Sequence, residues 1–227
     1  MEPLTLFTLF HVFVIDGDTF VYHGVKFRLY GVNAPERGMP CYEEAREALK
    51  EFFERGAQAI TVGEDRFGRR LVLVWNSRGS AASWLFSKGL AIPYPYAGPL
   101  VAKGYLADAL AKWRPGCLFK VGRTLVELVT FTYNPPGPDK EEIVLKNKSF
   151  KTVTVTLMNK RWSSVVVEVG PGVQTVTVTN FLGNKGDALV VHVKGTLQAL
   201  VAYIPKAFTS TVYPGGTWSP PLDSSSR

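Results

Sequence analysis

Residues 19–32 read TFVYHGVKFRLYGV, two runs of β-branched and aromatic residues on either side of the pair His23-Gly24. Such runs favour strands, and a pair of this kind between them is typical of a tight turn. This stretch therefore predicts a β-hairpin. The preceding residues 5–15 have the same composition and predict one further strand.

Helix and strand patterns alternate in the residues that follow the hairpin. Residues 42–55 carry alanine, leucine and phenylalanine at helical spacing and stop at Gly56, which predicts an amphipathic helix. We expect strands at 60–62 and 71–75, a short helix capped by Ser80, and a third helix at 100–113. Five short strands with a helix after the third match the element order of an OB-type five-stranded Greek-key barrel with helices.

The second half of the chain reads as strands only. Residues 125–203 are rich in valine and threonine and contain seven strand-like runs, separated by turn clusters such as Gly170-Pro171-Gly172. This pattern predicts an immunoglobulin-like β-sandwich. The expected fold class is mainly β with α, with domains at 1–122 and 123–208 and a flexible tail rich in proline, glycine and serine at 209–227.

The amino-acid composition limits the kinds of catalytic site that the chain can form. The chain has 227 residues, and a formal net charge of +7 favours an anionic partner. Three scattered histidines and two cysteines provide almost no material for a histidine metal site, a Ser-His-Asp triad or a disulfide scaffold. Hydrolytic chemistry would have to come from carboxylates, arginines and a hard metal ion. Cys41 and Cys117 lie at expected helix ends, where a disulfide and two free thiols both remain open.

The first fifteen residues show whether the chain begins with a signal peptide or a membrane span. Polar residues, among them Thr8 and His11, interrupt the apolar stretch there, and Glu2 stands where a leader would carry positive charge. We expect no signal peptide and no integral membrane span. A cytoplasmic location follows, with secretion as the alternative if the natural start lies further upstream.

Three polar motifs interrupt the strands of the first half. They read VIDGDT at 14–19, FRLYGVNAPE at 27–36 and DRFGR at 65–69. Taken singly, each is an ordinary turn, strand end or charged hairpin. Taken together and in this order, they resemble the thermonuclease family, which has the staphylococcal-nuclease-like fold, over about residues 8–120. The resemblance implies a metal-dependent, sugar-nonspecific nuclease that cleaves DNA and RNA to 3′-phosphate products, with single strands preferred.

The resemblance also implies a set of metal ligands. Asp18, the Asn33 side chain and the Ala34 carbonyl correspond to the ligands of one calcium or other divalent cation, and Asp16 would support them or merely shape the turn. Asparagine at position 33 departs from the usual aspartate, and Ala34 departs from a common threonine. The loss of one negative charge at Asn33 should weaken cation binding.

The remaining site residues follow from the same resemblance. Glu36 corresponds to the residue that positions or deprotonates the attacking water. Arg28 and Arg69 correspond to two guanidinium groups that clamp the phosphate, a task suited to planar, bidentate cations. Tyr94 and Tyr96 fall where the family lines its nucleotide pocket with tyrosines, although the same residues also suit a rigid surface turn.

The second half resembles the lamin-tail domain. The resemblance rests on YNPPGPD at 133–139, EIVLKN at 142–147 and NKGD at 184–187. No acid, base and nucleophile group together there, so we expect a noncatalytic, positioning role with an unknown partner. Two other classes of protein compete with the nuclease: a noncatalytic nucleic-acid-binding module on the same barrel, and a structural adhesion protein. The joint presence of Asp18, Arg28, Glu36 and Arg69 favours the enzyme.

Overall fold

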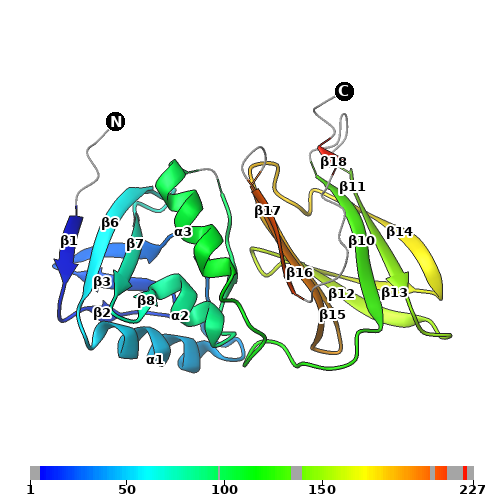
Figure 1. Ribbon diagram of the computed structural model, residues 1–227, viewed down its shortest axis with the longest axis horizontal. Helices are drawn as coiled ribbons and strands as arrows, with labels where there is room; N and C mark the ends of the chain where they lie inside the picture. The colour runs from blue at the N-terminus through cyan, green and yellow to red at the C-terminus, as the bar shows by residue number, and fades with distance from the viewer. Residues whose placement is uncertain (1–5, 97, 134–139, 205–207, 214–221, 224–227) are drawn as a thin grey trace. The chain divides into compact units, whose positions relative to one another are not determined.

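The computed structural model describes residues 6–96, 98–133, 140–204, 208–213 and 222–223. These residues form strands for the most part, together with three helices (Figure 1), so the predicted class, mainly β with α, is confirmed. The chain divides into two compact units, Met1–Tyr94 with Gly98–Leu118 and Pro95–Ala97 with Phe119–Arg227. Residues 134–139, which carry part of the lamin-tail resemblance, lie outside the described residues.

The first unit is built on one curled sheet (Figure 1). Its main path runs β1-β6-β7-β4-β3-β2, and every pairing on it is antiparallel except that of β4 with β7. A two-residue β8 extends β7, and β5 pairs separately with β9. The strands are β1 (Leu6–Leu9), β2 (Phe13–Val14), β3 (Thr19–Tyr22), β4 (Val25–Leu29), β5 (Val32–Asn33), β6 (Ala57–Glu64), β7 (Arg70–Asn76), β8 (Gly79–Ser80) and β9 (Ile92–Pro93).

The predicted hairpin is confirmed as β3 and β4, with Tyr22 opposite Val25. His23 and Gly24 both have left-handed φ angles, 47° and 75°, as a two-residue turn between twisted strands requires. The single strand expected at 5–15 is wrong, because the chain turns at His11, whose φ is 54°. That turn lets β1 pair with β6 while β2 pairs with β3.

Three helices complete the first unit: α1 (Tyr42–Phe53), α2 (Ala81–Ser87) and α3 (Leu100–Leu110). Helix α1 buries its predicted apolar face, and the chain leaves it at Gly56, where φ is 65°. Ser80 caps α2 as expected, since its Oγ accepts the N–H of Ser83 at 3.0 Å. No helix among the described residues has both the length and the apolarity to cross a membrane.

Cys41 and Cys117 form a disulfide within the first unit. Cys41 is the N-cap residue of α1, and Cys117 follows α3 in the chain. The bond therefore fixes the start of the first helix to the segment after the last one. The sequence left a disulfide and two thiols as alternatives, and the structure has the disulfide.

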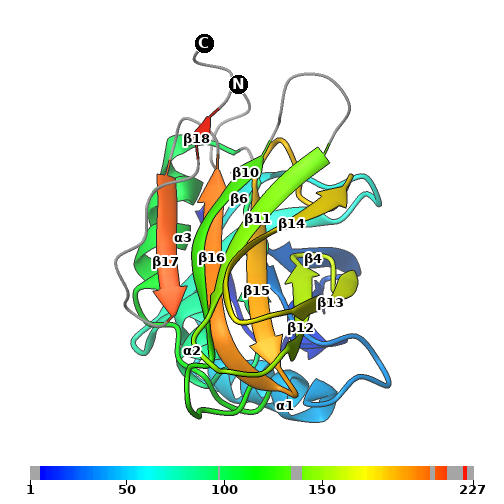
Figure 2. The same cartoon turned by 90° about the vertical axis from the view of Figure 1, so that its right-hand side faces the viewer.

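The second unit consists of two sheets, ordered β14-β11-β10-β18 and β13-β12-β15-β16-β17. In Figure 2, β10 and β11 lie in front of β15 and β16, and both sheets contribute side chains to one core that includes Phe131, Leu145, Leu157 and Tyr203. The strands are β10 (Val126–Tyr133), β11 (Lys140–Asn147), β12 (Val153–Asn159), β13 (Ser164–Val169), β14 (Gly172–Thr179), β15 (Asp187–Val193), β16 (Thr196–Ile204), β17 (Phe208–Tyr213) and β18 (Leu222–Asp223).

The seven strands predicted in this half are all present, as β10 to β16, with ends that shift by a few residues. Two further strands lie where the sequence predicted a tail. β17 pairs with β16, and β18 makes a two-residue parallel pairing with β10. Residues 208–213 therefore extend one sheet, and residues 222–223 extend the other.

Candidate functional site

The turn between β2 and β3 presents the first carboxylate of the site. Asp16 Oδ1 accepts the N–H of Asp18 at 3.0 Å, a local bond that fixes the turn. A β-carbon on Gly17 would lie 2.6 Å from the β-carbon of Ala34 and 2.7 Å from that of Ala45. Glycine thus lets the turn pack against α1, and Asp18 is buried there with only 2% of its surface exposed.

Both oxygens of the Asp18 carboxylate accept hydrogen bonds. Oδ1 accepts from the Thr19 hydroxyl and from Arg28 Nη1, both at 2.8 Å, and Oδ2 accepts from the Ala34 N–H at 2.9 Å. A buried carboxylate with donors on both oxygens and an arginine beside it avoids the cost of an uncompensated charge. The motif at 33–36 thereby meets the motif at 14–19 through the backbone of Ala34.

Arg28 projects from β4 and joins Asp18 to Asn33. Its Nη2 donates to Asn33 Oδ1 at 2.9 Å and to the Val32 carbonyl at 3.3 Å, while its Nη1 bonds to Asp18. The side chain is 11% exposed, and its guanidinium lies 5.5 Å from the centre of the Tyr94 ring. The guanidinium thus contacts the side-chain oxygens of both predicted metal-ligating side chains.

Arg69 is held by the tip of the hairpin between β6 and β7. Its Nε and Nη2 each lie 2.7 Å from Asp65 Oδ2, and Asp65 Oδ1 accepts the N–H groups of Phe67 and Arg69. Burial alone would raise the pKa of Asp65, but these hydrogen bonds outweigh it and lower that pKa. The Asp65 carboxylate therefore stays charged and fixes the direction of Arg69.

A chain of contacts connects all three sequence motifs. Arg69 Nη1 lies 3.5 Å from the Thr19 hydroxyl, which donates to Asp18, and Asp18 accepts from Arg28, which donates to Asn33. Sequence reasoning assigned no role to Thr19 or Asp65. Their positions inside the motifs, beside Asp18 and four residues before Arg69, were the available signals.

Glu36 makes none of these contacts, and the two predicted tyrosines belong to different units. Glu36 is exposed in the loop after β5, and its carboxylate makes no hydrogen bond or ion pair with any residue that the structure describes. Tyr94 contacts Arg28, but Tyr96 lies in the segment Pro95–Ala97, which belongs to the second unit. The first unit therefore brings together Asp18, Arg28, Asn33, Ala34 and Arg69, with Asp16 in the adjoining turn.

Two carboxylates, those of Asp16 and Asp18, lie close together at the turn. Burial, and next the charge of Asp18, raise the pKa of Asp16 to about 6. No group of three or more histidine, cysteine, aspartate or glutamate side chains gathers among the described residues. The predicted ligands would instead combine the Asp18 carboxylate with an amide oxygen and a backbone carbonyl.

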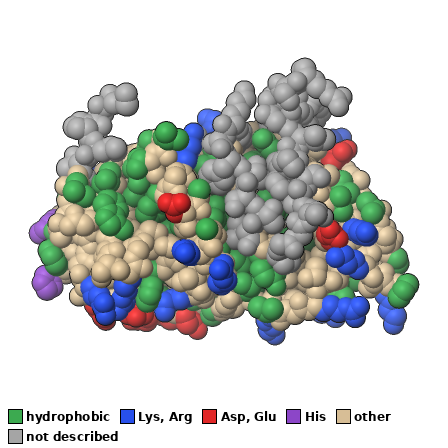
Figure 3. All heavy atoms as spheres, viewed as in Figure 1, with side chains coloured by type: hydrophobic (Ala, Val, Ile, Leu, Met, Phe, Trp, Pro, Cys, Tyr) green, Lys and Arg blue, Asp and Glu red, His purple; other side chains and the backbone are tan. Residues whose placement is uncertain are grey.

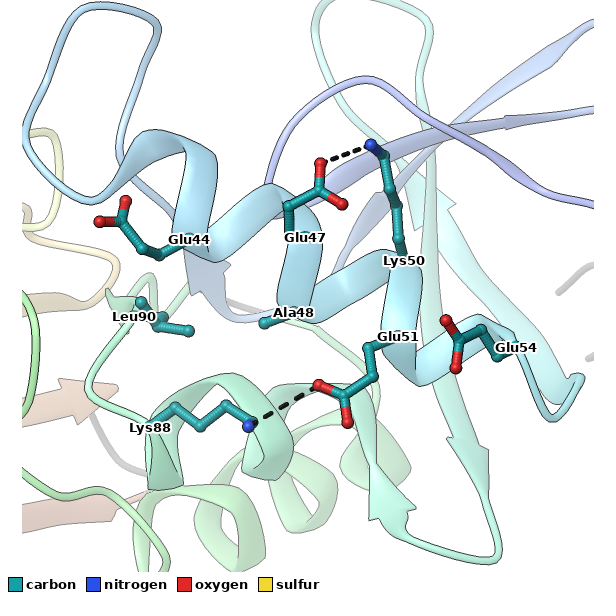
Figure 4. A pocket seen from close by; sticks show the side chains of 8 residues that line it. All are labelled: Glu44, Glu47, Ala48, Lys50, Glu51, Glu54, Lys88 and Leu90. Atoms are coloured by element: carbon teal, nitrogen blue, oxygen red, sulfur yellow. Dashed lines mark hydrogen bonds and ion pairs between the residues drawn. The ribbon is translucent and has the colours of Figure 1, made fainter.

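A separate open pocket of about 480 Å³ lies along α1, bounded by Leu90 and Lys88 (Figure 4). Its lining is acidic, and part of that charge is paired: Glu47 contacts Lys50, and Glu51 contacts Lys88. None of the predicted site residues lines it. An acidic lining repels phosphate, so this pocket does not extend the candidate site towards a nucleic acid.

The chain matches no protein-family model and no curated protein.

Proposed function

We propose that the first unit is a cation-dependent nuclease that hydrolyses phosphodiester bonds in DNA and RNA. The proposal rests on the set of contacts that joins Asp18, Arg28, Asn33 and Arg69. A phosphodiester substrate needs positive charge on its nonbridging oxygens, and two arginines held by separate strands suit that need.

The donor atoms fit a hard divalent cation such as calcium. Asp18, Asn33 and the Ala34 carbonyl offer oxygen only, which is the ligand atom that calcium prefers. When bound, such a cation would supply Lewis-acid stabilisation of the phosphate. Its ligands would include oxygens that accept from Arg28, so the cation and the guanidinium would compete for the same lone pairs.

The arginines would act on the phosphate. Arg69 is oriented by Asp65 and partly exposed, so it can meet a phosphate without rearrangement. Arg28 would exchange the Asp18 carboxylate and the neutral Asn33 amide for phosphate oxygens, so its charge would remain paired with an anion. Glu36 is exposed and free of bonds to described residues, so its carboxylate can accept a proton from an attacking water.

We assign the finer folds on the same basis. The curled sheet with a helix inserted before β6 suits an OB-type barrel of the staphylococcal-nuclease kind. The two packed sheets of the second unit suit an immunoglobulin-like sandwich of the lamin-tail kind, which would position the nuclease rather than catalyse.

The test is cleavage of single-stranded DNA, duplex DNA and RNA by the full chain, with calcium or with a chelator. We expect calcium-dependent cleavage, fastest on single strands, and products that end in a 3′-phosphate. Glu36→Gln should abolish most activity. Glu54→Gln, which changes another exposed glutamate in the first unit, should leave it unchanged. Absence of cleavage with calcium, magnesium or manganese would overturn the proposal.

The second candidate is a noncatalytic nucleic-acid-binding module. It is favoured by one observation: Arg28 already provides the positive charge at Asp18 and Asn33. In that case the chain would bind single-stranded DNA with equal affinity in calcium and in chelator, and would release it unchanged.

A further inference from the structure

Three loops of the second unit meet at one end of its two sheets. Backbone bonds join the loop before β10 to the turn between β15 and β16, since Lys120 donates to the Gly195 carbonyl at 3.0 Å. The same loop reaches the connection between β11 and β12, where Lys148 donates to the Leu125 carbonyl at 2.8 Å. We call this surface the basic end; it comprises residues 120–125, 146–151, 173 and 194–195.

The basic end is strongly cationic. It exposes six cationic side chains, of which only Lys148 forms an ion pair among the described residues, with Glu127 at 3.0 Å. Among the described residues, Glu168 is a second acid near this end, and it accepts the Thr154 hydroxyl. Four positive charges remain in excess, and Figure 3 shows blue side chains along the lower edge of the second unit. The six are Lys120, Arg123, Lys146, Lys148, Lys151 and Lys194.

Apolar side chains project from the same end of the unit. Phe150 is 99% exposed between Lys148 and Lys151, and Val121 and Val173 are 70% and 62% exposed. Val173 lies opposite Lys146 in the pairing of β14 with β11. Single exposed apolar residues are common. Three on adjoining segments, each beside a lysine or arginine, indicate a surface that binds an apolar partner.

We propose that the basic end docks on an anionic lipid bilayer, with Phe150 inserted between the headgroups. Lysines and arginines near a bilayer gain from the negative surface potential, and an aromatic side chain flanked by lysines suits the interface between headgroups and acyl chains. The exposed valines favour lipid over nucleic acid, because an aliphatic side chain has no aromatic face on which bases stack. Five of the six cations are lysines, which do not provide the bidentate geometry typical of nucleic-acid recognition.

The expected effects are measurable. Each lysine near a bilayer contributes about fivefold to partitioning, so the charge reversal Lys151→Glu, a change of two charges, should reduce it roughly 25-fold. Phe150→Ser should reduce it about tenfold, because a buried aromatic ring returns to water. Neither change removes a packing contact from the core, since both side chains are exposed. High salt should weaken binding by screening the lysines.

The experiment is sedimentation of the full chain with vesicles of phosphatidylcholine alone or of phosphatidylcholine with phosphatidylglycerol. We expect binding only when phosphatidylglycerol is present, with losses in Phe150→Ser and Lys151→Glu. Two matched controls should bind like the parent chain. Lys185→Glu reverses an exposed lysine before β15, at the opposite end of that strand from Lys194, and Phe13→Ser removes an exposed phenylalanine from the first unit.

Three outcomes would overturn the proposal. One is equal binding to both kinds of vesicle, and another is unchanged binding by Phe150→Ser and Lys151→Glu. The third is failure to bind phosphatidylglycerol vesicles while the same two variants lose affinity for single-stranded DNA, which would assign the basic end to nucleic acid. The first two are independent of the nuclease proposal because no vesicle assay depends on cleavage, and the third compares DNA affinities in chelator, where the proposed nuclease does not cleave.

Discussion

Arg28 compensates a buried carboxylate and is also a proposed phosphate ligand. We predict that Arg28→Ala lowers the free energy of unfolding by about 3 kcal/mol, because Asp18 then stays buried without its cationic partner. Arg69→Ala should cost less, since its partner Asp65 is at a more exposed hairpin tip. Urea denaturation measures both values. Cleavage should fall in both variants by about 10²- to 10³-fold, the cost of losing one charge-stabilising donor.

Arg66→Ala is the matched control for these two variants, because Arg66 is an exposed arginine in the same hairpin as Arg69. It should keep the stability and most of the activity of the parent chain. Equal stability losses in Arg28→Ala and Arg66→Ala would contradict the importance of the Arg28–Asp18 contact.

Asn33 tests whether the predicted ligands share one cation. Asn33→Asp adds a charge to the proposed site with little change in size, so we predict tighter calcium binding by isothermal titration calorimetry. The new carboxylate would also lie next to Asp18, but Arg28 contacts both positions and would offset their repulsion. We therefore expect little loss of stability without calcium and a larger rise in melting temperature with it. Equal calcium affinities would remove Asn33 from the site.

Lys160 should make the stability of the second unit depend on pH. Burial lowers the pKa of Lys160 to about 8, although the charge of Asp187 acts in the opposite direction. Its ammonium donates to the carbonyls of Pro95 and Gly186. Between pH 8 and about 10.5 the folded state has released this proton while the unfolded state keeps it, so deprotonation relieves the cost of burying the charge.

The free energy of unfolding should therefore rise with pH across this window, on the order of 2 kcal/mol, relative to Lys160→Met. Denaturation of both proteins at pH 7.5 and pH 10 measures the difference. Lys185→Met, which alters an exposed lysine of the same unit, should keep the pH dependence of the parent. A Lys160→Met curve parallel to that of the parent would contradict the lowered pKa.

Local patterns predicted most of the secondary structure elements. The periodic spacing of apolar residues predicted the buried face of α1, and the pair His23-Gly24 predicted the hairpin of β3 and β4. Both signals are local, because each depends only on residues that are close together in the sequence. The break at His11 was missed because a left-handed histidine has little sequence signature and β1 is stabilised by pairing with the distant β6. β17 was missed for a similar reason, since it forms an edge of a sheet made elsewhere in the chain.

The contacts within the candidate site could not be predicted either, because they join residues that are far apart in the sequence. The motifs indicated Asp18, Arg28, Asn33 and Arg69, but not which atoms pair, because that depends on how β3, β4 and the hairpin tip approach one another. The bridge from Arg69 through the Thr19 hydroxyl is a contact between residues fifty positions apart. Only the folded sheet brings these atoms within reach.

Helix α2 offers a prediction about a single element. Ser80→Ala removes the hydroxyl that accepts the Ser83 N–H, so the free energy of unfolding should fall by about 1 kcal/mol. Thermal denaturation followed by circular dichroism measures the loss. Ser87→Ala is the control, because its exposed hydroxyl donates to a carbonyl within the helix and caps no N–H group. A loss as large in the control would show that the effect is not one of capping.

At the scale of the molecule, one covalent bond restrains the first unit. The Cys41–Cys117 disulfide spans 76 positions, and closing a loop of that length in the unfolded chain contributes about 4 kcal/mol to stability. We predict that reductant lowers the melting temperature of the parent chain. The double variant Cys41→Ser and Cys117→Ser should melt at the lower temperature from the start and not respond to reductant. A parent chain that is insensitive to reductant would contradict the prediction.

The same bond makes a closed covalent ring of residues 41–117, and all three helices and the hairpin tip at Asp65–Arg69 lie within it. A protease that cuts the exposed Arg66 or Phe67 therefore opens the ring without releasing a fragment. The nicked protein should migrate as one species on a non-reducing gel and as two after reduction. Its two pieces stay covalently joined, so folded structure can persist through a backbone cut beside the proposed site.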